Sequence, residues 1–342
     1  MIKSIKILVV LVFLSLIVCN CSSERLDVDV SDIQVNLTVE RLEQELFASQ
    51  IGDVNILNKD LHTKYGFLYE AFLLKMINIG SPHDPMAVDQ LKLFVVDTSI
   101  LSIYKEIEDK FKDFSPYTDK LNESFKYYKY YFQDSSMPRV VTFYSHFNAN
   151  IFPYEDQLGI GLDMYLGTEH NLVKGLPNEF FPQYIKDKMD DKFLVADAMK
   201  GWLMNKFAEE MGDDFLSKIV ALGKVMYLLD ATMPFEDDHI KFGSSETKLN
   251  WCVTHEKDIW MDIVNNQVLY SKDKIKIMPY VNEGPFTKGM PHESPSQVGI
   301  WLGWQIVRDY MKYNEEMTVQ DMLQIKDARV ILKSYSQGER NE

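Results

Sequence analysis

The segment Ser294–Tyr313, SPSQVGIWLGWQIVRDYMKY, constrains the fold most, because it predicts a helix that is apolar on two faces. Ser294 suits the N-cap position and Pro295 suits the first turn, where a missing N–H costs no hydrogen bond. One face carries Ile300, Trp304, Val307 and Met311, and another carries Val298, Trp301 and Leu302. A helix of this kind is buried inside a protein. Because it carries Arg308 and Asp309, we predict the central helix of a large core rather than a lipid-spanning segment.

Two glycines in this segment, Gly299 and Gly303, stand four residues apart. In a helix this spacing removes side chains from one line along the surface. We therefore predict that a neighbouring element approaches the backbone closely at this line.

The N-terminus predicts export from the cytoplasm. Lys3 and Lys6 precede the apolar run Ile7–Val18, which is shorter than the roughly 20 residues that a membrane span needs. This pattern is typical of a secretory signal peptide. The following Val18-Cys19-Asn20-Cys21 is similar to a bacterial lipobox, in which a cysteine is acylated and becomes the new N-terminus. Cys21 is the better candidate, because the bulky Val18 precedes Cys19; cleavage without acylation is the alternative.

The charge of the chain excludes one class of partner. The formal net charge is −15, and removal of Lys3 and Lys6 with the signal peptide would make it −17. Such a surface repels nucleic acid, so we predict no nucleic-acid binding. In the acylated chain only Cys252 would keep a thiol, which leaves no internal disulfide and no cysteine tetrad for a metal.

The chain divides into four predicted parts: a signal peptide (1–20), a polar tether (21–37), a helical part (38–136) and an α+β part ending in helices (137–342). We expect the last two to form one compact unit. Residues 139–147 are rich in β-branched and aromatic residues, and residues 157–167 alternate strictly. We predict that these two strands are antiparallel neighbours. The predicted fold class is α+β, mostly α-helical, with a small antiparallel sheet.

One face of the second predicted strand carries Gly159, Gly161, Asp163 and Tyr165. Glycine within a strand indicates close approach of a ligand or of another backbone. This face could be a groove that accepts an extended peptide as an added strand. The alternative, which we favour, is that a helix or loop of the same chain covers it.

Glu256 lies among Leu249, Cys252, Ile259 and Ile263 on the apolar stripe of a helix predicted over 248–265. An unpaired buried carboxylate would cost several kcal/mol, so Glu256 needs a partner. We predict a cationic or hydrogen-bonding partner, with Arg308 as the first choice. A catalytic acid is the less favoured alternative.

The search for catalytic motifs is negative. His255-Glu256 and His292-Glu293 are followed by Ile259 and Ser296 where HExxH requires a second histidine. The sequence contains no GxSxG, GxxxxGK[ST] or GxGxxG. We predict neither a metal site nor a cofactor.

Several segments resemble one family when their order and spacing are taken together. They are RLEQELF (41–47), LGIGLDMYLG (158–167), LPNEFFPQYIKDKM (176–189), GKVMYLLDATMP (223–234), WCVTHEKDIW (251–260) and GPFTKGMPHESPSQVGIWLGWQIVRDYM (284–311). With the lipobox-like N-terminus, they resemble the gliding motility lipoprotein GldB family of Bacteroidetes. The resemblance implies an envelope lipoprotein needed for gliding and linked to type IX secretion, with no established enzyme activity. It also implies a distant likeness to zinc peptidases. If that likeness is right, this chain is a degenerate peptidase scaffold that has lost its metal ligands.

We therefore expect a lipid-anchored envelope protein, facing the periplasm, that supports the gliding and secretion machinery through protein–protein contacts. The alternative is an envelope hydrolase of peptidase type that uses the carboxylates of Asp163 and Glu256.

Overall fold

The computed structural model describes residues 25–48, 53–208 and 212–336. It is mostly helical and contains a small sheet, so the predicted α+β class is confirmed. Among the described residues, one hydrophobic core runs from Leu26 near the start to Tyr335 near the end.

The sheet is mixed, with four strands among the described residues in the order β1-β2-β4-β3. The strands are β1 (Val39–Arg41), β2 (Arg139–Phe143), β3 (Ile151–Tyr154) and β4 (Gln157–Gly161). β2 pairs in parallel with both β1 and β4, whereas β3 runs antiparallel to β4. Val140 lies opposite Val39 on one side and Leu158 on the other, which fixes the register of the buried centre.

The predicted antiparallel pairing of residues 139–147 with 157–167 is wrong, because the link between them forms a strand of its own. β3 runs back along the outer side of β4, so β2 and β4 point the same way. Pro153 is tolerated in β3 because this strand lies at the sheet edge. The second strand is also shorter than predicted: it ends at Gly161, and Leu162–Tyr165 form the 3-10 helix η2.

The first half of the chain supplies the helices around the sheet. They are α2 (Leu42–Ala48), α3 (Val54–Tyr65), α4 (Phe67–Ala71), the π-helix η1 (Phe72–Met76), α5 (Pro85–Val96), α6 (Thr98–Phe111) and α7 (Ser115–Tyr131). Asp53, Asp84 and Asp97 cap α3, α5 and α6 by accepting hydrogen bonds from backbone N–H groups of the first turn.

The second half supplies the remaining helices. They are α8 (Asn171–Gly175), α9 (Gln183–Lys186), η3 (Asp191–Phe193), α10 (Leu194–Phe207), α11 (Phe215–Thr232), α12 (Asp238–Phe242), α13 (Glu246–Thr254), α14 (Glu256–Asn265), α15 (Lys274–Val281), α16 (Val298–Tyr313), α17 (Val319–Gln324) and α18 (Ala328–Leu332). The single helix predicted over 248–265 is therefore two helices, because the backbone leaves the helical conformation at His255.

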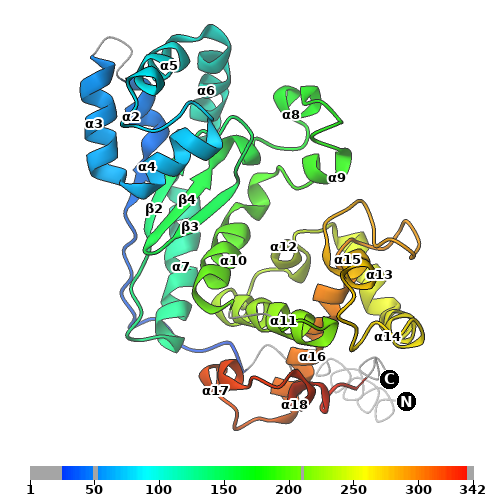
Figure 1. Ribbon diagram of the computed structural model, residues 1–342. Coiled ribbons are helices and arrows are strands. Elements are labelled where there is room, and N and C mark those ends of the chain that lie inside the picture. Colours follow the sequence, from blue (N-terminus) through cyan, green and yellow to red (C-terminus); the bar gives the residue numbers. More distant parts are fainter. Residues whose placement is uncertain (1–24, 49–52, 209–211, 337–342) are drawn as a thin grey trace, which may run out of the picture.

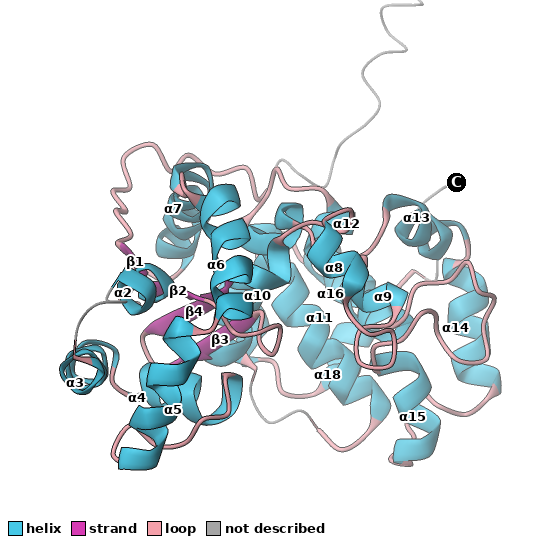
Figure 2. Ribbon diagram, turned by 90° about the horizontal axis from the view of Figure 1, so that it is seen from above, coloured by secondary structure: helices cyan, strands magenta, loops and turns pink. Residues whose placement is uncertain are grey.

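The elements form two sides joined by α10. Figure 1 shows α3–α6 gathered around one end of the sheet, with α17 and α18 at the opposite end of the molecule. Seen from above, the sheet and its helices lie on one side and α13–α15 on the other (Figure 2). α10 contacts the strands β3 and β4 as well as the helix α11, so it links the two sides.

α16 is the buried central helix that the sequence predicts, and it crosses α11 through glycines. Trp301 and Trp304 are at most 2% exposed. A Cβ atom on Gly303 would lie 1.9 Å from the carbonyl oxygen of Ile219, and one on Gly223 would lie 2.2 Å from the carbonyl oxygen of Gly303. The two helices therefore touch through their backbones, which confirms the predicted close approach.

The predicted start of this helix at Ser294 is wrong. α16 begins at Val298, after Gln297 in the left-handed conformation. Ser294 is buried in the preceding loop, where its hydroxyl accepts a hydrogen bond from the Thr287 N–H at 3.3 Å. The side chain that could have capped the helix is thus used to hold the loop.

Residues 25–37 pack against the body, although the sequence predicts a polar tether over 21–37. Leu26, Val30 and Leu37 are buried. The predicted signal peptide (1–20), Cys19 and Cys21 lie outside the described residues. Within the described ranges, no helix combines the length and apolarity needed to cross a bilayer.

Candidate functional site

The strand face predicted as a possible peptide groove is filled by other parts of the chain. A Cβ atom on Gly159 would lie 2.7 Å from the Phe143 ring, and one on Gly161 would lie 1.9 Å from the carbonyl oxygen of Ala149. Asp163 and Tyr165 are 0% and 1% exposed. The structure therefore supports the favoured interpretation, in which other parts of the chain cover this face, and not the alternative of an open groove.

Asp163 organises the loop that follows β2. Its carboxylate accepts hydrogen bonds from the backbone N–H groups of Ser145 and Phe147 and from the Ser145 hydroxyl. His146 and Phe147 have φ values of 57° and 61°, which are uncommon for residues other than glycine. Burial raises the pKa of Asp163 to about 6, against the opposing effect of these hydrogen bonds. Its contacts are those of a structural residue.

Replacing Asp163 with asparagine should lower the free energy of unfolding by roughly 1–3 kcal/mol, because the amide nitrogen cannot accept the buried N–H groups. Chemical denaturation of the purified protein measures this. Asp156→Asn, at an exposed position in the turn between β3 and β4, is the control and should be neutral. Equal stability of the two variants would show that the Asp163 carboxylate does not hold the loop.

Glu256 is buried and has a hydrogen-bonding partner, as predicted, but this partner is not Arg308, the first choice. The Tyr335 hydroxyl donates a hydrogen bond to Glu256 at 2.9 Å, and Arg308 binds other carboxylates. Figure 1 shows α14, which begins at Glu256, on the other side of the molecule from β4, and Asp163 lies in η2, directly after β4. The structure does not bring these two carboxylates together, and both are buried, so it gives no support to the hydrolase alternative.

Arg308 is the centre of a partly buried charge network, in which Asp230 and Lys241 are buried and the Arg308 and Asp238 side chains are 28% and 39% exposed. Its guanidinium donates to Asp230 at 2.7 and 2.8 Å and to Asp238 at 2.6 and 2.8 Å. Lys241 Nζ lies 2.7 Å from Asp230 and 3.0 Å from Asp238, so two cations face two carboxylates. The Trp304 indole N–H donates to Asp230 at 2.7 Å, and its ring lies 3.8 Å below the guanidinium.

This network joins α11, α12 and α16. Burial alone would raise the pKa of Asp238, but Arg308 and Lys241 outweigh burial and hold that pKa far below its ordinary value. Sequence reasoning missed the network, although an acidic residue within the apolar helix α11 is a signal for a buried partner. We assign it a role in holding the three helices together.

Two cavities were candidates for ligand binding. One, of about 160 Å³, lies beside α12, α13 and the loop before α16, and is below the roughly 300 Å³ of typical ligand pockets. The other, of about 760 Å³, lies between α10, α11 and α17. Burial lowers the pKa of Lys224 in this second cavity to about 8, and its amine donates to the carbonyl oxygens of Leu323 and Ile325. Because Lys224 is committed to these backbone contacts, the cavity does not indicate catalysis.

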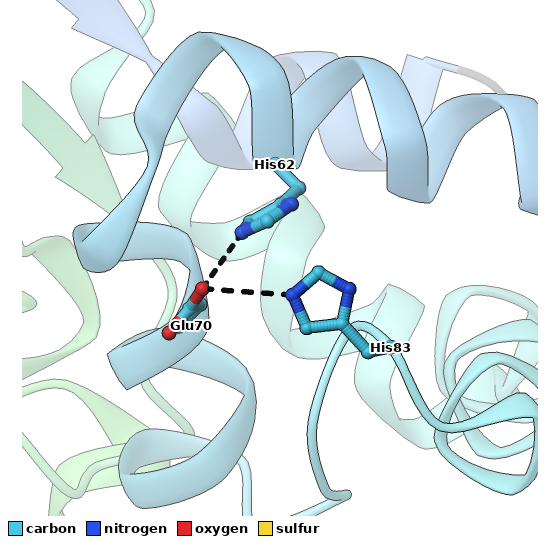
Figure 3. Close-up of side chains that lie close together, drawn as sticks. All are labelled: His62, Glu70 and His83. Atoms are coloured by element: carbon cyan, nitrogen blue, oxygen red, sulfur yellow. Dashed lines mark hydrogen bonds and ion pairs between the residues drawn. The ribbon is translucent and has the colours of Figure 1, made fainter.

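A third group of side chains, His62, Glu70 and His83, was not singled out by the sequence. One ligand atom from each lies within 4.8 Å of the others. His62 comes from the last turn of α3, Glu70 from α4 and His83 from the loop before α5 (Figure 3). Among the described residues, these are the histidine, cysteine and acidic side chains that come close enough in a group of three to hold a metal ion.

A comparison with protein families decides the relationship of this chain. The family model described as gliding motility protein GldB matches residues 23–337. The chain belongs to the GldB family. Neither curated proteins nor solved structures gave a significant match.

The GldB match covers every described residue, which confirms the resemblance of the sequence segments. Those segments contain Asp163, Asp230 and Arg308, so the resemblance includes residues that hold the GldB core together. The likeness to zinc peptidases finds no support. On α10, the helix it would use, Asp197 accepts a hydrogen bond from the Tyr165 hydroxyl at 3.1 Å.

Proposed function

We propose that this GldB-family protein is an envelope lipoprotein that supports the gliding and type IX secretion machinery by binding its proteins. The observation that carries the proposal is the family match over residues 23–337. The buried positions of Asp163 and Glu256, each hydrogen-bonded within the chain, give no support to the hydrolase alternative. In this proposal acylated Cys21 anchors the protein in a membrane and the body faces the periplasm.

The start of the folded body supports a short anchor. The Arg25 guanidinium donates hydrogen bonds to the carbonyl oxygens of Met311 and Met317, beside the end of α16. Three residues lie between Cys21 and Arg25, so the two are at most about 14 Å apart along an extended chain of four residue steps. With Cys21 acylated, the end of the molecule that carries α17 would therefore lie next to the membrane.

The opposite end of the molecule offers apolar side chains for protein contacts. Met86, Leu93 and Val96 of α5 are 73%, 61% and 49% exposed, and their spacing places them on one side of the helix. Figure 1 shows α5 at the end of the molecule away from α17. Exposed apolar groups there suit contact with another protein of the machinery rather than with lipid.

Replacing Cys21 with serine should abolish incorporation of labelled fatty acid and move the protein from the membrane pellet to the soluble fraction, because the acyl chains supply the anchor. The matched control is Cys19→Ser, which should retain both the label and the membrane location. Labelled Cys21→Ser protein, or loss of label from Cys19→Ser protein alone, would contradict anchoring at Cys21.

A further inference from the structure

We propose that His62, Glu70 and His83 form a binding site for a divalent transition metal ion, with Zn²⁺ as the best fit. His62 Nε2 lies 2.8 Å from Glu70 Oε1, and His83 Nε2 lies 3.9 Å from the same oxygen. Both rings direct a nitrogen at the carboxylate (Figure 3). Neighbouring ligands of a tetrahedral zinc ion are about 3.3 Å apart, given bonds of about 2.0–2.1 Å. Small side-chain rotations would bring the three ligand atoms to that spacing.

The backbone brings His62 and Glu70 together through the turn at Gly66. This residue has φ 56° and ψ −127°, and its N–H bonds the carbonyl oxygen of His62. A side chain at this position would be strained, because L-residues rarely adopt positive φ. The turn directs α4 back against the last turn of α3 (Figure 3), so Glu70 faces a histidine eight residues earlier in the sequence.

A layer of buried hydrogen bonds beneath the cluster holds its three segments in place. Asn58, one turn before His62 on α3, donates from Nδ2 to the carbonyl oxygen of Pro82 at 2.8 Å. The Tyr69 hydroxyl donates to Asn58 Oδ1 at 3.1 Å. Asn58 is 7% exposed and Tyr69 is fully buried. Since Tyr69 precedes Glu70 and Pro82 precedes His83, one buried asparagine positions the segments of all three ligands.

A simple ion pair accounts for His62 and Glu70 but not for His83. The His83 side chain is 71% exposed and could extend into water, yet its Nε2 faces the oxygen that His62 already contacts. The two rings stand edge to face, with centroids 4.8 Å apart and an angle of 88° between their planes. Two imidazole nitrogens beside one carboxylate oxygen, all within 4.8 Å of one another, supply the donor atoms that a zinc ion takes from a protein.

The donor set selects the class of ion. Imidazole ligands favour Zn²⁺, Cu²⁺, Ni²⁺ or Fe²⁺ over Ca²⁺ and Mg²⁺, which prefer sites made of oxygen alone. The three side chains are 27%, 34% and 71% exposed, so water or a ligand from a partner could complete the coordination. A bound ion would cross-link α3, α4 and the loop before α5, and would thereby stiffen the helices around one end of the sheet.

Isothermal titration calorimetry tests the proposal: ZnCl₂ is titrated into the full-length, metal-stripped protein in detergent, and the heat of binding is measured. We expect one site in the wild type. His83→Ala and Glu70→Gln should each weaken binding by more than about tenfold, since loss of even an outer-shell partner costs that much. Zn²⁺ should raise the Tm of the wild type more than that of either variant. Co²⁺ should give d–d absorption bands without a thiolate charge-transfer band, because the ligands are nitrogen and oxygen.

The matched control is His170→Ala. His170 also pairs with a glutamate, Glu106, at 3.3 Å. Among the described residues, however, no third metal-ligating side chain lies close enough to this pair to form a group of three. This variant should bind Zn²⁺ as the wild type does. His83→Ala removes a ring that is 71% exposed, so it keeps the test valid if Glu70→Gln misfolds. Absence of Zn²⁺ binding in the wild type, or equal affinity in His83→Ala and His170→Ala proteins, would overturn the proposal.

Discussion

Replacing Gly303 with alanine should destabilise the protein by more than about 4 kcal/mol, because the new methyl group has no space in the crossing of α11 and α16. Its Cβ would lie 1.9 Å from the Ile219 carbonyl oxygen and 2.5 Å from the attached carbon. These are backbone atoms of a buried helix, so they cannot move aside as a flexible side chain could. To accommodate the methyl group, α11 and α16 would have to separate and lose packing along their contact.

Thermal or chemical denaturation of the purified variant measures the effect, and loss of soluble protein is its extreme form. Gly175→Ala is the matched control, since an added Cβ there meets no atom within 4 Å. This control should change stability by less than about 1 kcal/mol. A Gly303→Ala protein as stable as the control would show that the two helices do not meet through their backbones.

Replacing Arg308 with methionine should lower the free energy of unfolding by about 3 kcal/mol, because it removes a cation from the buried carboxylate of Asp230 and from the partly exposed carboxylate of Asp238. Asp230 is 3% exposed and would keep Lys241 as its remaining cationic partner, with Trp304 as a hydrogen-bond donor. The control is Arg329→Met, whose pair with Asp327 is exposed, and it should leave the denaturation midpoint unchanged. Equal midpoints for the two variants would contradict a structural role for the network.

The same network predicts a dependence on pH. Arg308 and Lys241 hold the folded-state pKa of Asp238 below its ordinary value of 3.8, against the effect of burial. Asp238 therefore contributes stability above the unfolded-state pKa, and this contribution is lost as the pH falls through the lower, folded-state pKa. The stability of the Arg308→Met protein should accordingly fall less steeply below about pH 4 than that of the wild type.

Features that depend on nearby residues were predictable from the sequence. The spacing of apolar residues in 294–313 predicted a buried helix, and Gly299 and Gly303 predicted its close contact with a neighbour. The start of that helix was not predictable, because Ser294 binds Thr287 in the preceding loop instead of the helix.

The sheet topology was not predictable, because parallel pairing joins distant segments. β1 has only three residues and pairs with β2 about a hundred residues later in the chain, so no local sequence pattern predicts this pairing. The alternation beyond Gly161 favoured a strand, but the contacts of Asp163 with Ser145 and Phe147 favour the 3-10 helix found there.

The candidate sites show the same contrast: features set by neighbouring residues were predictable, and contacts between residues distant in the sequence were not. The burial of Glu256 followed from its apolar neighbours, whereas its partner Tyr335 lies 79 residues away. The spacing of His62, Glu70 and His83 matches no metal-binding motif. Their convergence depends on the turn at Gly66 and on the contact of Asn58 with the loop before α5.

The gliding speed of single cells whose own gene copy encodes the Cys21→Ser protein is the most direct test of the central claim, that the body acts while anchored to the membrane. Immunoblots of the membrane and soluble fractions would confirm the amount and location of the protein. We predict wild-type amounts of folded, unacylated protein in the soluble fraction and cells that do not glide. Gliding at wild-type speed by cells with only this soluble protein would contradict the claim.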